Sequence, residues 1–252
     1  MGTLDGRAAI VTGASQGVGR GIALALAHEG ASLALIGRSP EPLAEVVAEI
    51  EDAGGTAVAI ACDVADLDRI PEVVDRAVQA LGGVDILVNN AWSGSLGRLL
   101  DLSDADLELG FRTGPFATFA FMKACHPHLA KSGEGNIVNL ISAVTVRWDA
   151  SGYGAYAAAK SAVRSLTRAA AAEWGRDGIR VNAIAPLALS PGLRRWIDSS
   201  PEEAEAFLAT VPLGRVGDCR DDIGRTVALL VGPGCSYLTG ATIPLDGGQA
   251  HF

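Results

Sequence analysis

The stretch that decides the fold is Arg7-Ala-Ala-Ile-Val-Thr-Gly-Ala-Ser-Gln-Gly-Val-Gly19. Its first part, residues 7–12, is a short apolar run typical of a buried strand, and residues 20–29 after it predict a helix. Glycines between a strand and a helix let the backbone approach a phosphate, and the helix N-terminus offers free N–H groups and a positive dipole end. Glycines also simply make turns, so it is the strand–turn–helix order that favours a phosphate-bearing cofactor here.

Short apolar runs and amphipathic segments alternate along the rest of the chain. Strands are predicted at 7–12, 32–36, 56–61, 84–88, 136–141, 179–184 and 241–244. Helices are predicted at 20–29, 41–52, 67–81, 104–128 with a disturbance at Gly114-Pro115, 156–174, 201–209 and 221–230. This order predicts an α/β fold, a doubly wound and mostly parallel sheet with helices on both faces. We expect residues 1–252 to form one domain, with the Pro- and Gly-dotted segment 187–217 as a substrate lid.

Composition excludes several classes of protein. The 252 residues carry a net charge of −9 and form no basic stripe, so we expect no nucleic-acid partner. The four cysteines (Cys62, Cys125, Cys219 and Cys235) lack the spacing of a metal site, and we expect no metal. The first residues lack an apolar signal core, and charged residues break the apolar helical runs, which predicts a cytoplasmic protein without a membrane span.

Four loops are predicted at the carboxyl edge of the sheet, where ligands of such folds bind: 13–19, 37–39, 62–64 and 89–92. An acid at the end of the second strand would indicate NAD, but Gly37 stands there and Arg38 follows it. A guanidinium suits the 2′-phosphate of NADP, so we predict NADP(H) in preference to NAD(H), the alternative being an ordinary surface arginine. Asp63 either meets the adenine amino group or caps the next turn.

Tyr156 and Lys160 are four residues apart on a predicted helix and therefore share one face. A nearby ammonium is expected to lower the phenol pKa from its usual value of about 10, and such a phenol can exchange a proton near neutral pH. Taken alone, the pair is more typical of a solvated helix face. Ser142, however, follows the strand 136–141, so all three side chains are predicted to converge on the cofactor edge.

Taken together, these residues resemble the short-chain dehydrogenase/reductase family over nearly the whole chain. The motifs are Thr12-Gly13-x-x-x-Gly17-x-Gly19, Asn89-Asn90-Ala91, Asn139-x-x-Ser142, Tyr156-x-x-x-Lys160, Arg180-Val-Asn-x-Ile-x-Pro186 and Tyr237-x-Thr-Gly…Asp246-Gly-Gly. The resemblance implies a Rossmann-type fold and hydride transfer between a nicotinamide and a carbonyl or secondary alcohol. It implies Tyr156 as general acid or base, Lys160 on the nicotinamide ribose, and Ser142 on the substrate oxygen.

The resemblance also implies a set of cofactor contacts and an assembly. The contacts carried over are Gly13, Ser15, Gln16, Val18, Gly19, Arg38, Asp63, Val64, Asn90, Ala91, Tyr156, Lys160, Pro186 and Leu189. The family suggests a homotetramer built through the predicted helices 104–128 and 156–174.

The chain departs from the family pattern at several positions. Phe111 stands at or near the place of an asparagine that supports a proton relay from the catalytic lysine. Trp92 replaces the glycine that usually follows Asn-Asn-Ala, where a bulky indole is expected to crowd the nicotinamide side or line the substrate pocket. Leu187 replaces another glycine, Ser190 is the nearest hydroxyl for the nicotinamide amide, and Gln16 replaces a basic residue frequent in NADP-preferring members.

Three of the four tryptophans, Trp92, Trp148 and Trp196, fall on loops predicted at the active edge. Aromatic walls favour an apolar or ring-bearing substrate, although these indoles can equally pack under loops or at a subunit contact. Arg147, Arg194 and Arg195 lie on the same loops and face either an anionic group or water. The substrate therefore stays open among a ketone, a 3-oxoacyl thioester, a steroid-like alcohol and a sugar.

Two alternative functions stay open beside the oxidoreductase. The missing helix asparagine and Trp92 fit a dinucleotide-binding sensor or scaffold protein with little turnover, against which the intact Ser142, Tyr156 and Lys160 argue. A dehydratase or epimerase would need a separate substrate domain, for which 252 residues leave no room.

Overall fold

The computed structural model describes residues 2–147 and 151–250. Within them, seven strands form one parallel sheet in the order β3-β2-β1-β4-β5-β6-β7. The strands are β1 Ala8–Thr12, β2 Ser32–Gly37, β3 Thr56–Ala61, β4 Ile86–Asn89, β5 Gly135–Leu140, β6 Ile179–Pro186 and β7 Thr242–Leu245. The strand order reverses between β1 and β4, so the predicted doubly wound sheet is confirmed, and the reversal marks the ligand-binding crevice.

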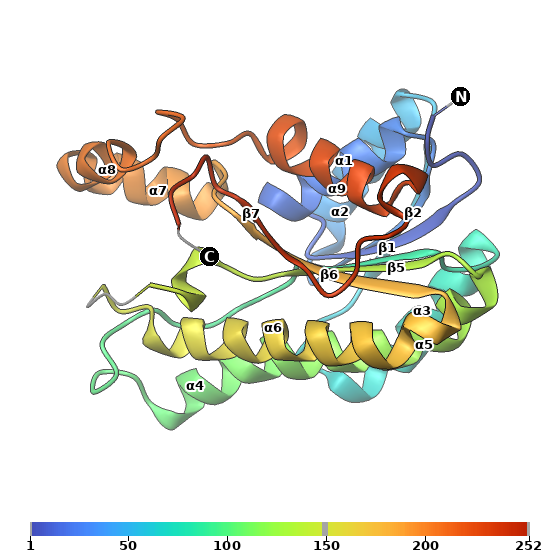
Figure 1. Ribbon diagram of the computed structural model, residues 1–252, viewed down its shortest axis with the longest axis horizontal. Coiled ribbons are helices and arrows are strands. Elements are labelled where there is room, and N and C mark those ends of the chain that lie inside the picture. Colours follow the sequence, from blue (N-terminus) through green and yellow to red (C-terminus); the bar gives the residue numbers. More distant parts are fainter. Residues whose placement is uncertain (1, 148–150, 251–252) are drawn as a thin grey trace.

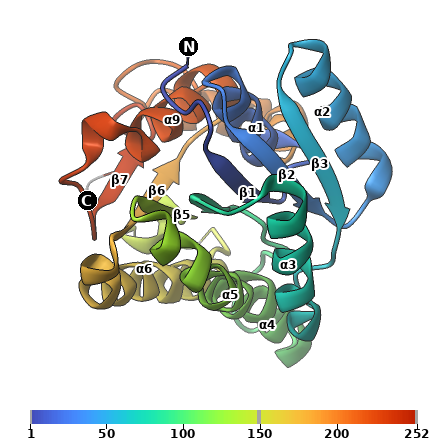
Figure 2. The ribbon, with the colours of Figure 1, turned by 90° about the vertical axis from the view of Figure 1, so that its right-hand side faces the viewer.

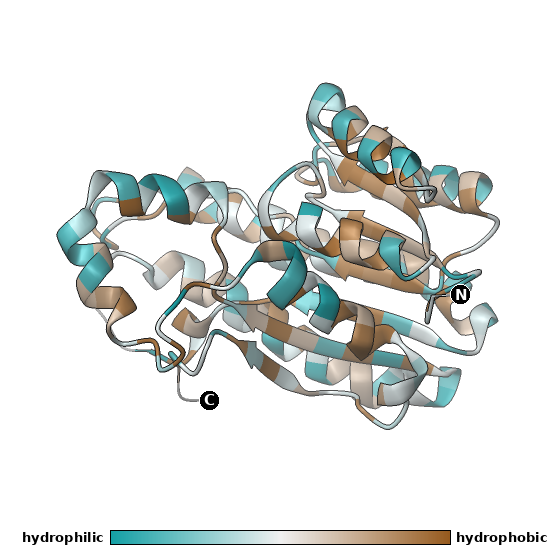
Figure 3. Ribbon diagram, turned by 90° about the horizontal axis from the view of Figure 1, so that it is seen from above, coloured by the Kyte–Doolittle hydropathy of each residue, from teal (hydrophilic) through white to brown (hydrophobic). Residues whose placement is uncertain are grey.

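Helices cover both faces of the sheet (Figure 2). One face carries α1 Gly17–His28, α2 Pro40–Asp52 and α9 Arg225–Val231. The other carries α3 Ile70–Leu81, α4 Asp104–Phe111, α5 Ala117–Ser132 and α6 Gly154–Trp174. Alternate strand residues serve the two faces: Val11 and Leu35 pack toward α1 and α2, whereas Ile10 and Ile36 pack toward α3 and α5. The strands are accordingly mostly in the hydrophobic colour in Figure 3, as expected of a buried parallel sheet.

The predicted helix 104–128 is divided into three parts. Helix α4 ends at Phe111, a π-helical turn η2 (Arg112–Phe116) follows, and α5 then runs to Ser132. Gly114 leaves the helical region, with φ −91° and ψ −105°. The expected disturbance at Gly114-Pro115 is confirmed, because proline has no N–H for the helical ladder and its ring displaces the preceding turn.

The segment 187–217 contains two helices where the sequence predicted one. Helix α8 (Pro201–Leu208) was expected, but α7 (Pro191–Ser199) was missed. The Ser190 hydroxyl caps α7 by accepting from the Leu193 N–H (3.2 Å), and Pro191 is preorganised for the first turn. Ser190 followed by Pro191 is a typical helix start, but Gly192 and the prolines of this segment argued against a helix. Both helices lie at one end of the molecule, beside the carboxyl ends of β6 and β7 (Figure 1).

The predicted helix 221–230 begins earlier than expected. A π-helical turn η5 (Cys219–Gly224) precedes α9, and Asp218 caps it by accepting from the Arg220 and Asp221 N–H groups (2.7 Å each). None of the helices in the described ranges combines the length and apolar character that a membrane span requires.

Candidate active site

The glycine-rich turn after β1 has the geometry of a phosphate cradle. Gly13 (φ +66°) and Gly17 (φ +55°) adopt left-handed backbone conformations, which glycine adopts without steric cost. Gly19 packs so closely that a Cβ there would lie 2.3 Å from the Gly13 carbonyl oxygen. The side chain of Gln16, at the N-cap of α1, makes no capping hydrogen bond. The first amides of α1 thus keep no side-chain partner, and this end of the helix fits the pyrophosphate of a dinucleotide.

Thr12 and Asn90 join the ends of β1 and β4. The Asn90 side-chain amide donates to the carbonyls of Thr12 (2.9 Å) and Gly13 (3.1 Å), and the Thr12 hydroxyl accepts from the N–H groups of Asn90 (3.0 Å) and Ala91 (3.1 Å). Sequence reasoning assigned Asn90 to the cofactor and gave Thr12 no role. The structure shows that both residues hold the glycine-rich turn in place.

A buried polar chain fixes α6 against the sheet. Asn89 donates to the Asn139 side-chain oxygen (2.8 Å), Asn139 donates to the Thr167 hydroxyl (2.9 Å), and Thr167 donates to the Val163 carbonyl (2.9 Å). Thr167 lies seven residues after Lys160 and therefore on the same helical face. The sequence analysis missed it, although a threonine among the apolar residues of a buried face is a usable signal.

Ser142, Tyr156 and Lys160 meet at the carboxyl end of β5, as predicted. The Ser142 side chain lies near enough to the Tyr156 phenol to lower its pKa. The buried Lys160 ammonium lies 5.7 Å from the centroid of the Tyr156 ring and donates to the Leu140 carbonyl (2.8 Å). The three side chains thus lie together at one edge of the sheet.

The expected lowering of the Tyr156 pKa is wrong for this structure. Burial raises the pKa of Tyr156 to about 12, against the smaller, opposite effect of the Ser142 hydrogen bond. Burial also lowers the pKa of Lys160 to about 8. Desolvation disfavours the charged form of both groups. The expectation rested on attraction between ammonium and phenolate, but Lys160 is not among the groups that shift the Tyr156 pKa.

The remaining predicted cofactor residues lie at or after the carboxyl ends of the strands. Arg38 is exposed at the end of β2, Gln16 is exposed, and Ser15, Val18 and Ala91 are half-buried. Asp63 accepts from the Ala65 N–H (2.9 Å), the contact expected of a turn cap, and Val64 beside it is buried. Pro186 ends β6, and Leu189 is exposed two residues before α7. Together with the α1 terminus, these groups fit a nicotinamide dinucleotide.

The three predicted pocket tryptophans have different surroundings. Trp92 contacts Tyr156 edge to face, with ring centroids 4.6 Å apart. Trp196 packs on Phe207 between α7 and α8 (5.7 Å), and Trp148 lies outside the described residues. Phe111 packs against Phe116 (6.3 Å). The Ser190 hydroxyl, suggested for the nicotinamide amide, serves as the cap of α7.

No group of three or more metal-binding side chains occurs in residues 2–147 and 151–250.

The chain is similar to known proteins over nearly its whole length. A family model described as enoyl-(acyl carrier protein) reductase matches residues 13–250. A 12α-hydroxysteroid dehydrogenase of a Clostridium species is 40% identical over all of this chain and 99% of its own length. A 7α-hydroxysteroid dehydrogenase solved with NADH and 7-oxo glycochenodeoxycholic acid superposes with a TM-score of 0.93 at 33% identity, covering 99% of this chain and 96% of that one.

A short-chain dehydrogenase of Burkholderia cenocepacia solved with NADP superposes with a TM-score of 0.90 at 34% identity, covering 98% of this chain and 99% of that one. Nothing in these comparisons favours the sensor or scaffold alternative. The chain belongs to the short-chain dehydrogenase/reductase family and is an oxidoreductase that transfers hydride between a nicotinamide dinucleotide and a carbonyl or secondary alcohol.

Proposed function

We propose that the chain interconverts a secondary alcohol and a ketone on an apolar, ring-bearing substrate of steroid type, with NADP(H) and with Tyr156 as general acid and base. The observation that carries the proposal is the contact of Ser142, Tyr156 and Lys160 beside the glycine-rich turn. The names of the hydroxysteroid dehydrogenases among the relatives support the substrate class.

The protein's own groups handle the proton and the substrate oxygen. The nicotinamide supplies or accepts the hydride at the substrate carbon. In reduction, the Tyr156 phenol donates its proton to the carbonyl oxygen, and Ser142 donates a second hydrogen bond to that oxygen. Both donors stand in place before charge develops, so they stabilise the transition state without reorganising. In oxidation Tyr156 accepts the proton from the alcohol.

Burial suits Tyr156 to the reductive direction. With its pKa raised to about 12, the phenol is protonated at neutral pH and available as an acid. Lys160, fixed by the Leu140 carbonyl 2.8 Å away, would hold the nicotinamide ribose and present its positive charge when phenolate forms.

The preference for NADP(H) rests on the end of β2. Arg38 is exposed there, and Gly37 before it presents no carboxylate that would repel a 2′-phosphate. An exposed guanidinium binds phosphate through paired hydrogen bonds. The uncharged Gln16 leaves Arg38 as the cation assigned to that phosphate.

Segment 187–217 is proposed as the substrate lid. Its two ends are joined, since Leu189 N–H donates to the Gly217 carbonyl (2.9 Å) and Gly217 N–H donates to the Leu187 carbonyl (3.1 Å). Between these ends, α7 has no buried residue and α8 has only Ala204. A segment with so little buried surface opens at low free-energy cost.

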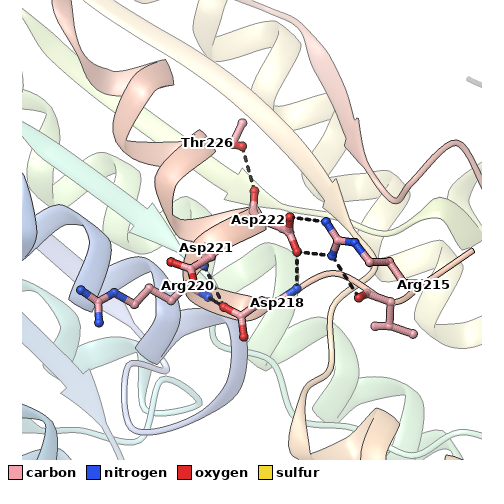
Figure 4. A network of polar contacts seen from close by, with 7 residues as sticks. Arg215, Asp218, Arg220, Asp221, Asp222 and Thr226 are labelled. Carbon is pink, nitrogen blue, oxygen red and sulfur yellow. Dashed lines mark hydrogen bonds and ion pairs between the residues drawn. The ribbon is translucent and has the colours of Figure 1, made fainter. Parts of the chain in front are cut away.

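A polar network anchors the carboxyl end of the lid (Figure 4). Arg215 donates to both carboxylate oxygens of Asp222 (2.5 and 2.7 Å), and Asp222 also accepts from the Asp218 N–H (2.6 Å). This clamp ties the lid to the turn that begins α9.

The proposal extends to assembly and location. Exposed apolar side chains Leu107, Leu109, Phe116 and Phe119 lie along α4, η2 and α5, and such a face is typical of a subunit contact. We propose a homotetramer built through this region and α6, in the cytoplasm, where the four free cysteines stay reduced. Sedimentation of the purified protein would test the tetramer, and a monomer would contradict it.

Calorimetric titration with NADPH and, separately, NADH tests the cofactor. We expect tighter binding of NADPH and a loss of that preference in Arg38→Asp, because a carboxylate repels the 2′-phosphate. Equal affinities in the parent, or an unchanged preference in the variant, would contradict the role of Arg38. The matched control is Arg225→Asp, an exposed arginine on α9, which is expected to leave the preference unchanged.

Oxidation of bile acids with NADP⁺ tests the substrate class. Deoxycholate carries hydroxyls at ring positions 3 and 12, and chenodeoxycholate carries them at positions 3 and 7. Oxidation of either steroid supports the proposal, and identification of the ketone formed shows which hydroxyl reacts. Failure to oxidise either one while a small ketone or sugar is turned over would overturn the steroid assignment.

A further inference from the structure

Trp92 occupies a slot formed by three glycines from two segments. A Cβ on Gly94 would lie 2.6 Å from Trp92 Cζ2, one on Gly114 would lie 3.3 Å from Cδ1, and one on Gly110 would lie 3.8 Å from Cζ2. Gly94 follows Trp92 in the loop after β4, and the other two belong to α4 and η2. The indole is therefore packed between loop and helix rather than standing free in a pocket.

The polar edge of the indole is held as well. Trp92 Nε1–H donates to the Gly110 carbonyl (3.2 Å). In the π-helical register, the donor for that carbonyl would be residue 115, and Pro115 has no N–H. The indole thus supplies a hydrogen bond that the kinked helix does not supply in this register. Thr113 strengthens the contact between the same two segments by accepting from the Ser93 N–H (3.0 Å).

The indole also contacts the proposed acid. The Trp92 and Tyr156 rings lie 4.6 Å apart at 64°, within the range of a favourable edge-to-face pair. Among the described residues, the titratable groups shown against the Tyr156 ring are Tyr153, the N-cap of α6, and Lys160 on the helix itself. Ser142 and Trp92 face it without charge, and Arg112 on η2 extends away to the Ala65 carbonyl (2.6 Å).

We propose that Trp92 is a positioning residue for Tyr156: fixed by the Gly110 carbonyl and the three-glycine slot, its indole sets the orientation of the phenol and shields it from water on the side of α4. The kinetic consequence of this inference rests on the proposed role of Tyr156, whereas the contact itself does not. Where a small residue follows Asn90-Ala91, this side of the phenol would be open to water and bulk protons.

The first test needs no substrate. Tyrosinate absorbance is titrated in the parent and in Trp92→Gly. The same titration is recorded for each protein with Tyr156→Phe added, and the difference between the two curves isolates the signal of Tyr156. Because desolvation raises the pKa of this phenol, removing the indole is expected to lower it by at least about one pH unit. Superimposable Tyr156 titrations in the two proteins would overturn the inference, whatever the substrate proves to be.

The second test is a double-mutant cycle that guards against simple misfolding. Gly94→Ala places a methyl against Cζ2, an atom that phenylalanine at position 92 does not have. With Trp92 present, Gly94→Ala is expected to lower kcat for deoxycholate oxidation about tenfold to a hundredfold, since small misplacements of catalytic groups cost that much, with KM for NADP⁺ within about twofold of the parent. In the Trp92→Phe background, the same substitution is expected to cost less than about twofold.

Equal losses from Gly94→Ala in both backgrounds would overturn the proposal, because the effect would then come from the loop and not from the indole. Trp174→Phe is the matched control, since Trp174 packs on His126 at the far end of α6 (4.9 Å). It is expected to leave both kcat and the Tyr156 titration unchanged.

Discussion

At the scale of single residues, burial governs the protonation of the site. It pushes Tyr156 toward the phenol and Lys160 toward the amine, with a pKa of about 12 for the first and about 8 for the second. At neutral pH the site therefore holds a phenol beside an ammonium. That is the charge state a carbonyl reductase needs before its proton is donated.

Tyr156→Phe is expected to lower kcat by about 10²- to 10⁴-fold, the usual contribution of a general acid or base. Affinity for NADPH should change little, because the ring and its contact with Trp92 are preserved. Steady-state kinetics and calorimetry on the same preparation measure the two effects. Turnover at the parent rate would rule out Tyr156 as the acid.

Lys160 gives a prediction about stability and pH. Its folded pKa, about 8, lies below its ordinary value of 10.5, so between these values the unfolded chain binds more protons than the folded one. Stability therefore rises with pH through this window. We expect the unfolding free energy of the parent to increase relative to that of Lys160→Met as the pH rises from about 8 to 10.

Urea unfolding at several pH values measures this difference. Lys123, an exposed lysine of α5, is the matched control, and Lys123→Met should follow the parent at every pH. A parent and a Lys160→Met variant whose difference in stability does not change across the window would show that Lys160 is not desolvated as described.

At the scale of elements, local pattern predicted most of what was found. Strands such as Thr56–Ala61 were placed to the residue, because a short apolar run that follows two glycines and ends before Asp63 leaves few alternatives. The errors occurred where a contact outside the window decides the outcome. Helix α7 depends on its Ser190 cap and on packing of Trp196 against Phe207, and η5 depends on Asp218, none of which changes hydrophobic periodicity.

Helix α6 illustrates an element whose position no local pattern gives. Its alignment with β5 depends on the buried chain from Asn89 through Asn139 to Thr167. Thr167→Val keeps the shape of the side chain but leaves the Asn139 amide with only a long contact to Met122 Sδ (3.6 Å). We expect a loss of about 1–3 kcal/mol in unfolding free energy, the usual cost of a buried donor without a partner.

Denaturant unfolding measures that loss. Thr118→Val is the control, because Thr118 is a buried threonine of the neighbouring helix α5 that takes no part in the Asn89–Asn139–Thr167 hydrogen bonds. A Thr167→Val protein as stable as the parent would mean that the polar chain does not anchor α6.

At the scale of the whole molecule, the site is assembled from residues far apart in the sequence. Motif spacing predicted that Ser142, Tyr156 and Lys160 would meet, since the carboxyl ends of parallel strands share one edge. Spacing could not predict that Trp92 fits between Gly94 and Gly114. Such a fit depends on the three-dimensional relation of a loop to a kinked helix, and no one-dimensional pattern records it.

The lid provides the last prediction, because its anchor lies outside the reacting groups. The hydrogen bonds from Arg215 lower the pKa of Asp222 to about 2. The carboxylate thus stays charged at pH values well below its ordinary pKa, and its contribution to stability is lost only as the pH falls toward 2. The clamp of Arg215 and Asp222 is therefore intact throughout the range in which the enzyme would be assayed.

Asp222→Asn replaces one acceptor by a donor. In either orientation its amide N–H₂ faces the guanidinium of Arg215, and in one of them it also faces the Asp218 N–H. Loss of this charge-assisted pair should loosen the lid. We therefore expect KM for the steroid to rise about threefold to tenfold, while kcat and the affinity for NADPH stay within about twofold of the parent. Such a pattern indicates that binding of substrate and transition state is weakened equally. Asp221→Asn is the matched control, since Asp221 pairs only with exposed Arg225 among the described contacts of its side chain (3.3 Å). An Asp222→Asn enzyme with the parent's KM would show that the clamp does not hold the lid over the substrate, and a fall in kcat alone would place Asp222 in support of the catalytic groups instead.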